Sequence, residues 1–220
     1  MVFDSGIGGT TVLEHIQQSI PDAQYSYFMD NALLPYGAQS QQTIINRLCA
    51  LIHFINQQAL NVDLIVIACN TASTSALGAV RQITTIPIVG VVPAIKPAAQ
   101  LTQSKHIGLL ATPATILSPY TRTLIQEHTN NIAVSLYSSV ELVTLAERLF
   151  FEQSLDTTKL HQELDRLNID QSIDVLVLGC THFPILAEPI SQYFNRKVQL
   201  LDSGAAIAKR VHYLISQLNL

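Results

Sequence analysis

Eight short runs of apolar and β-branched residues alternate with longer helical stretches along the whole chain. They predict strands at residues 2–3, 25–29, 64–68, 86–91, 107–111, 132–136, 175–178 and 198–201. The clearest helix is expected at 41–58, where apolar residues recur at the spacing of one helical face. Such alternation predicts an α/β fold, with parallel sheets covered by helices. Ligand sites in these folds lie beyond the carboxyl ends of the strands, so residues that follow a strand are the first candidates for chemistry.

Two strand ends, half the chain apart, have similar sequences. Residues 64–71 and 175–182 both run an apolar strand into a small residue, a cysteine and a polar pair, with Cys69 and Cys180 111 residues apart. Coincidence between two buried strands is one explanation. We favour internal duplication, which gives two similar lobes related by a pseudo-twofold axis, each contributing a cysteine to a shared cleft.

The positions of prolines and of the last helical stretch predict how the lobes divide. Residues 91–97, punctuated by Pro93 and Pro97, are expected to form the first crossover, and a helix at 205–217 is expected to return to the first lobe. We therefore predict a first α/β lobe of residues 1–93 plus 203–220 and a second of 94–202. Each has a mostly parallel sheet flanked by helices, and the active site lies in the cleft between them.

Charge and composition narrow the classes of function. With 12 basic and 16 acidic residues the net charge is -4, and charged residues make up 13% of the 220, about half of the roughly 25% usual in globular proteins. The sequence lacks the basic stripe that would indicate a nucleic-acid-binding protein. Its apolar runs are far shorter than the ~20 residues of a membrane span. The first residues show no signal-peptide pattern, and three widely spaced cysteines predict reduced thiols. We expect a cytoplasmic protein.

The paired cysteines carry the strongest chemical signal. One sulfur on each face of a substrate carbon is what stereochemical inversion requires, because one thiolate removes a proton while the opposite thiol delivers another. A helix N-terminus or polar neighbours can bring a thiol into its working range. Asp4, Glu147 and His182 are candidates to orient or tune these thiols, although Glu147 also fits a solvent-facing helical acid. Cys49, within the helix predicted at 41–58, is expected to pack.

Several other polar residues follow predicted strands. The turn from Asp4 and Ser5 through Gly6 to Gly9 fits either an anion site or a simple helix cap, and it lacks the lysine of a P-loop. Pro35, Tyr36 and Gly37 form a plausible cleft loop. Thr112 and Thr115 are hydroxyls at a strand end that equally fit helix capping.

Two cofactor-based alternatives have little support. A zinc site could be drawn from Cys69, Cys180 and His182, but their spacing matches no metal motif. The lysines are scattered, and none has a setting that suggests a pyridoxal Schiff base. We predict neither a metal nor a cofactor.

Together these segments resemble the glutamate racemases of the aspartate/glutamate racemase superfamily, bacterial enzymes that make D-glutamate for peptidoglycan. The two cysteine motifs, residues 68–73 and 178–184, are highly specific as a pair, and the resemblance covers almost the whole chain. It implies a cofactor-independent two-base mechanism, with Cys69 serving D-glutamate and Cys180 serving L-glutamate. It also implies that Asp4 assists Cys69, and that Glu147 and His182 assist Cys180.

The resemblance further assigns substrate contacts. They are expected at Asp4, Ser5, Pro35, Tyr36, Gly37, Asn70, Thr71, Thr112, Thr115, Thr181 and His182. Hydroxyls, amides and backbone N–H groups, rather than Lys or Arg, should meet the substrate carboxylates. Near-attack contacts of roughly 3–3.5 Å on each side predict sulfurs about 6–8 Å apart.

Some alternatives remain. The substrate could be aspartate or another amino acid instead of glutamate, because the length of the pocket decides between them. A function of a different class is a binding or regulatory protein with a degenerate site. Members of the family are often homodimers, and the low surface charge is compatible with one. The first strand is shorter than is usual in the family, so a truncated N-terminus is expected.

Overall fold

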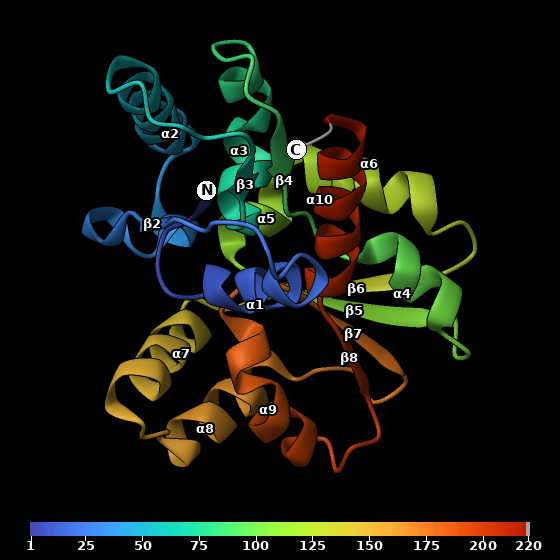
Figure 1. Cartoon of the computed structure of the whole chain (residues 1–220). Coiled ribbons are helices and arrows are strands. Elements are labelled where there is room, and N and C mark those ends of the chain that lie inside the picture. Colours follow the sequence, from blue (N-terminus) through green and yellow to red (C-terminus); the bar gives the residue numbers. More distant parts are fainter. Residues whose placement is uncertain (219–220) are drawn as a thin grey trace.

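The computed structural model describes residues 1–218 and contains two four-stranded parallel sheets (Figure 1). The first sheet has the order β2-β1-β3-β4 and the second the order β6-β5-β7-β8. Their strands are β1 (Val2–Asp4), β2 (Tyr27–Met29), β3 (Ile65–Ile67), β4 (Ile88–Gly90), β5 (His106–Ala111), β6 (Ala133–Ser138), β7 (Val175–Gly179) and β8 (Gln199–Leu201). All eight predicted strands are present, and the predicted α/β class with two similar lobes is confirmed.

The two sheets repeat one topology. In each, the first strand pairs in parallel with both the second and the third, and the fourth extends the sheet beyond the third. Strands β3 and β7 are therefore equivalent, and each is followed by one of the paired cysteines. This shared strand order supports the internal duplication inferred from the sequence.

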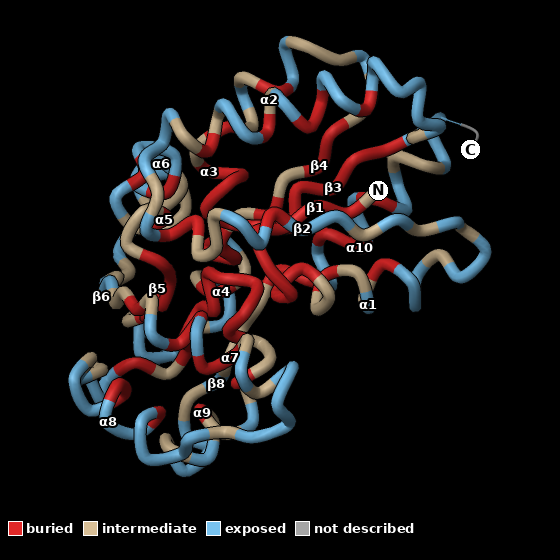
Figure 2. The backbone as a smooth tube through the Cα atoms, turned by 90° about the vertical axis from the view of Figure 1, so that its left-hand side faces the viewer, coloured by how far each residue is buried: buried red, intermediate tan, exposed pale blue. Residues whose placement is uncertain are grey.

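Helices cover both faces of each sheet. They are α1 (Gly9–Ser19), α2 (Gln41–Gln57), α3 (Asn70–Arg81), α4 (Ile95–Leu101), α5 (Pro113–Leu117), α6 (Pro119–His128), α7 (Glu141–Glu152), α8 (Thr157–Leu167), α9 (Ala187–Tyr193) and α10 (Gly204–Leu218), with short 3-10 turns η1 (Asn31–Leu33), η2 (Tyr36–Ala38) and η3 (Phe183–Leu186). The helix predicted at 41–58 is α2, and its apolar face is buried against the first sheet. Figure 2 shows the burial concentrated along the strands and the inner helix faces.

Alternating residues of the second sheet divide between two cores. Leu109, Val175 and Val177 pack with α4 and α6, whereas Leu176 and Leu178 pack with α7, α8 and α9. Successive side chains of a strand point to opposite faces, so each strand contributes to both cores. Because both faces of the sheet are covered by apolar side chains, its polar functional groups lie at the strand ends.

The C-terminal helix returns to the first sheet. In α10, Ile207, Ala208 and Val211 join a buried cluster with Val12 and Ile16 of α1, and Figure 1 shows α10 beside α1 and β4. The two crossovers between the sheets also touch, because Ser203 Oγ donates to the carbonyl of Val92 at 2.6 Å. Residues 219 and 220 of the predicted segment 203–220 lie outside the described residues. Within residues 1–218, the helices lack the combination of length and apolar character needed to cross a membrane.

Candidate active site

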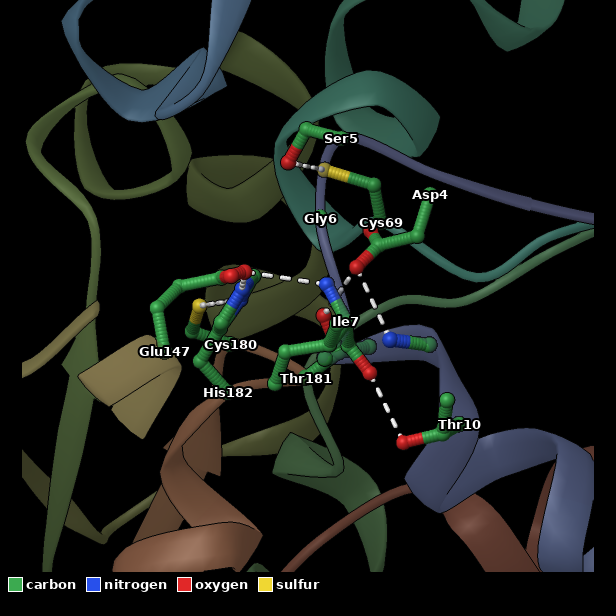
Figure 3. A network of polar contacts seen from close by, with 12 residues as sticks. Asp4, Ser5, Gly6, Ile7, Thr10, Cys69, Glu147, Cys180, Thr181 and His182 are labelled. Atoms are coloured by element: carbon green, nitrogen blue, oxygen red, sulfur yellow. Dashed lines mark hydrogen bonds and ion pairs between the residues drawn. The ribbon is translucent and has the colours of Figure 1, made fainter. Parts of the chain in front are cut away.

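The carboxyl ends of the two sheets meet between the lobes, and the candidate residues gather there (Figure 3). In this view Cys69 and Asp4 lie on one side of the backbone around Gly6, and Cys180, His182 and Glu147 lie on the other. Both sulfurs follow central strands, at 5% and 7% exposure for Cys69 and Cys180. Both are free thiols, as expected, and Cys49 packs at the edge of the first core.

Cys69 is the N-cap residue of α3. Its Sγ accepts a hydrogen bond from the backbone N–H of Ala72 at 3.5 Å and lies 3.8 Å from the hydroxyl of Ser5. Burial, and then the charge of Asp4, raise the pKa of this thiol well above its usual value. In these surroundings the neutral thiol is the favoured form of Cys69.

Asp4 combines a capping bond with an unused oxygen. Its Oδ2 accepts from the N–H of Gly9, the first residue of α1, at 2.8 Å, and from the hydroxyl of Thr181 at 3.4 Å. Its Oδ1 is buried and has no hydrogen-bond partner within residues 1–218. Burial raises the pKa of Asp4, while the charge of His182 opposes that rise. Asp4 can therefore both cap α1 and contact a ligand, because Oδ2 makes the capping bond and Oδ1 is left without a partner.

Cys180, His182 and Glu147 form a hydrogen-bonded chain. Cys180 Sγ lies 3.8 Å from Nδ1 of His182, whose Nε2 lies 2.7 Å from Oε1 of Glu147. Burial alone would lower the pKa of His182, but its hydrogen bonds to Cys180 and Glu147 outweigh burial and raise the pKa to about 10. The histidine is therefore an imidazolium near neutral pH. An imidazolium carries a proton on both ring nitrogens, so Nδ1–H of His182 can donate to Sγ of Cys180.

Glu147 also ties the second lobe to the first. Its Oε1 accepts from the backbone N–H of Ile7 at 2.9 Å, besides its contact with His182. Burial would raise the pKa of Glu147, but the bonds from His182 and Ile7 outweigh it and lower the pKa. The solvent-facing interpretation of Glu147 does not fit these contacts.

The glycines of the first turn allow this close approach. A Cβ at Gly6 would lie 2.2 Å from Oε1 of Glu147, and a Cβ at Gly8 would lie 2.7 Å from the backbone nitrogen of His182. Gly8 has φ -55° and ψ -35°, which any residue can adopt. Position 8 therefore requires glycine for steric reasons, because a side chain there would clash with His182 of the opposite lobe.

Hydroxyls from both lobes meet beside the thiols. Thr71 Oγ1, at the start of α3, lies 2.8 Å from Thr112 Oγ1 and 3.1 Å from Thr115 Oγ1. Thr112 also caps α5 by accepting from the N–H of Thr115. The side-chain nitrogen of Asn70 is buried without a hydrogen-bond partner among residues 1–218. The site thus presents a group of uncharged donors.

The loop of Pro35, Tyr36 and Gly37 reaches the same hydroxyls through its backbone. Tyr36 is 1% exposed, and its hydroxyl donates to Oδ2 of Asp30 at 2.8 Å. A Cβ at Gly37 would lie 2.5 Å from Cβ of Thr112, so backbone and threonine are in close contact.

Sequence reasoning did not single out Thr11 or Arg47. Thr11 donates to the carbonyl of Thr181 at 3.2 Å, across the lobes, and Arg47 pairs with Asp30. Thr11 stands in the glycine-rich turn and helix start, which is the signal that could have found it. Arg47 lies within an amphipathic helix and carries no such signal.

The cavity beside the second cysteine is small. A cavity of about 10 Å³ adjoins Cys180, Thr181 and Asn70, which is room for about one water molecule. This cavity is too small to hold an amino acid.

Comparisons with known proteins identify the family of this chain. The model of the family Asp/Glu/Hydantoin racemase matches residues 9–211. The chain is similar to a glutamate racemase from Shewanella frigidimarina, 51% identical over 217 residues that cover 99% of this chain and 83% of the relative. A glutamate racemase from Shewanella woodyi is 52% identical, with coverage of 99% and 81%.

A solved structure is similar over both sheets. Escherichia coli glutamate racemase, in complex with L-glutamate and the activator UDP-MurNAc-Ala, superposes with a TM-score of 0.91 at 41% identity. The match covers 98% of this chain and 82% of that chain. The similarity therefore includes both strand ends that carry the cysteines.

Proposed function

The chain belongs to the Asp/Glu/Hydantoin racemase family, and from this premise we propose that it interconverts L-glutamate and D-glutamate without a cofactor. The family resemblance predicted from the two cysteine motifs is confirmed. The observation that carries the proposal is the matched placement of Cys69 and Cys180 after equivalent strands, each with its own polar partners.

Opposite electrostatic surroundings suit the two thiols to complementary roles. Cys180 lies beside the imidazolium of His182, and Cys69 lies near the carboxylate of Asp4. We propose that Cys180 acts as the base that removes the α-proton of L-glutamate. The resulting carbanion takes a proton from the thiol of Cys69 on the other face, which gives D-glutamate. In the opposite direction the two sulfurs exchange roles.

Two unpaired buried groups in the site match the two charges of an amino acid. Buried polar groups are nearly always hydrogen-bonded in folded proteins, and Oδ1 of Asp4 and the amide nitrogen of Asn70 are exceptions among residues 1–218. We assign the acceptor Asp4 Oδ1 to the substrate ammonium and the donor on Asn70 to a carboxylate. Ser5, Thr71, Thr112, Thr115 and Thr181, with the backbone of residues 35–37, supply the remaining contacts.

Stabilising the carbanion requires a closed, water-poor site. The bonds from Ile7 to Glu147 and from Thr11 to Thr181 join the two lobes, so closure also completes the environment of Cys180. We propose that residues 1–93 plus 203–220 and residues 94–202 move as two units to admit substrate.

Loss of optical rotation by L-glutamate, without added cofactor and with a chelator present, tests the proposal. The same assay with L-aspartate separates the alternative substrate. Wild type should racemise glutamate much faster than aspartate, and Cys69→Ser and Cys180→Ser should each lose activity, while Cys49→Ser retains it. A chain that binds glutamate but never racemises it would instead be a binding protein with a degenerate site.

Three further predictions remain. A cytoplasmic location is expected from the sequence patterns, and a role in supplying D-glutamate for peptidoglycan and a homodimer are expected from the family resemblance. Sedimentation of the purified chain tests the last of these.

A further inference from the structure

An ion pair between a buried carboxylate and a half-exposed arginine lies behind the cleft loop. Asp30 directly follows β2 and is 6% exposed. Arg47, from α2, donates through Nε to Oδ2 at 2.8 Å and through Nη2 to Oδ1 at 2.6 Å. The hydrogen bonds from Arg47, and then that from Tyr36, lower the pKa of Asp30 against the effect of burial. Asp30 is therefore a fixed, ionised acceptor.

The same carboxylate holds the hydroxyl of Tyr36. Charge-assisted hydrogen bonds of this kind are roughly twice as strong as neutral ones. The Tyr36 ring packs in the first core with Phe3 and Cys69. The hydroxyl points to Asp30, so this side chain acts as an anchor for the loop.

The anchored loop forms part of the substrate site. Within η2 few backbone bonds fix the chain, chiefly Ala38 N–H to Pro35 and Gln39 N–H to Tyr36. Gly37, next to the anchor, contacts Thr112, which is hydrogen-bonded to Thr71. A displacement of the loop would therefore remove a packing neighbour of Thr112, whose hydroxyl is paired with that of Thr71.

We propose that Asp30 and Arg47 are positioning residues for racemisation, which hold Tyr36 so that residues 35–37 stay docked on Thr112 and complete the carboxylate site. This inference rests on the proposed glutamate racemase function. A loop that is docked only part of the time lowers the apparent affinity by the docked fraction. Saturating substrate selects the docked form, so turnover at saturation changes little.

A purely structural role for the ion pair predicts a different outcome. An ion pair that only attaches α2 to the sheet would change stability, without a selective effect on KM. The second lobe offers a matched control in Arg166, which makes a similar two-pronged contact with the buried carboxylate of Glu163.

The test compares Arg47→Met, Tyr36→Phe, their double variant and Arg166→Met in the full chain. We expect Arg47→Met and Tyr36→Phe each to raise KM for both glutamate enantiomers roughly tenfold, with kcat within about twofold of wild type. The double variant should have the KM of Tyr36→Phe alone, because Arg47 acts through Tyr36. Arg166→Met should leave KM unchanged.

Amide hydrogen exchange gives a readout that does not depend on activity. Arg47→Met should accelerate exchange at Ala38 and Gln39 roughly tenfold, and Arg166→Met should not. An unchanged KM in active Arg47→Met, or KM effects that multiply in the double variant, would overturn the positioning role. The proposed racemase function would not be affected by either result. If wild type racemises no glutamate, the proposed function fails, and unchanged exchange in Arg47→Met would then overturn the docking of the loop as well.

Discussion

Glu147 lies 2.7 Å from Nε2 of His182 and holds the imidazole as a cation beside Cys180. The same carboxylate oxygen accepts the N–H of Ile7 from the other lobe. Glu147 thus stabilises the cation beside Cys180 and also accepts a hydrogen bond from the other lobe. No comparable imidazole contact is present at Cys69 within residues 1–218, so the two halves of the site differ electrostatically although their strands are equivalent.

Replacing Glu147 should affect the two proton transfers unequally. Glu147→Gln removes the charge that supports the His182 cation, so proton abstraction by Cys180 should slow and kcat should fall roughly 10²-fold. Racemisation has an equilibrium constant of unity, so kcat/KM must fall equally in both directions. The primary isotope effect should rise with α-deuterated L-glutamate and not with the D-enantiomer. An equal rise with both would contradict the assignment, and Glu152→Gln, an exposed acid on the same helix, should behave as wild type.

His182 should make the folded state less stable as the pH rises. Its pKa is about 10 in the folded chain against an ordinary value of 6.5, so the native state binds this proton more tightly. The contribution is complete below pH 6.5 and is lost toward pH 10, with a slope of at most about 1.4 kcal/mol per pH unit. Above pH 9.0 the raised pKa of Cys69 adds a slope of the same sign.

Urea unfolding between pH 6.5 and pH 9.0 measures this slope. His182→Gln should flatten the dependence of the unfolding free energy on pH, and His53→Gln, an exposed histidine on α2, should not. Parallel curves for wild type and His182→Gln would show that the histidine does not titrate as described.

A methyl group at Gly8 should disrupt the contact between the lobes. In Gly8→Ala the new Cβ would lie 2.5 Å from Nδ1 of His182 and 2.7 Å from its backbone nitrogen. We expect kcat/KM to fall roughly 10²-fold and the free energy of unfolding to fall by about 1–3 kcal/mol. Gly78→Ala is the matched control, because a Cβ in that part of α3 meets nothing within 4 Å. It should keep full activity and gain about 0.5–1 kcal/mol of stability, and equal behaviour of both variants would refute the steric account.

Removing the Thr71 hydroxyl should weaken substrate binding. Thr71→Val keeps the shape of the side chain but deletes the contacts with Thr112 and Thr115. KM for glutamate should rise roughly tenfold, measured by initial rates in both directions. Thr144→Val, at an exposed position of α7, should leave KM unchanged. A normal KM in Thr71→Val would exclude this hydroxyl from the carboxylate site.

The framework of the fold was predictable because the signals are local. Apolar β-branched runs marked all eight strands, and the repeated strand-end pattern placed the two cysteines after β3 and β7. Boundaries were less accurate, as with the strand predicted at 86–91, which spans Ile88–Gly90. An apolar run can continue past the last ladder hydrogen bond, since burial and strand pairing do not end at the same residue.

The contacts between distant segments could not be predicted. Gly8 requires glycine because His182, 174 positions later in the chain, packs against it. The pairing of Arg47 with Asp30 depends on how α2 crosses the sheet, and a half-exposed arginine on an amphipathic helix gives no sign of its partner. The helical pattern identified the buried face of α2 but not the polar contacts at its border.

Deuterium incorporation at low conversion tests the two-thiol mechanism most directly. L-Glutamate is incubated with the enzyme in deuterated water without a cofactor, and the α-positions of product and remaining substrate are analysed by mass spectrometry after separation of the enantiomers. Two thiols on opposite faces predict D-glutamate that carries solvent deuterium while the remaining L-glutamate is still protonated. Cys69→Ser and Cys180→Ser should form no labelled product. Equal labelling of both enantiomers from the earliest times, or undiminished labelling in either variant, would contradict the account.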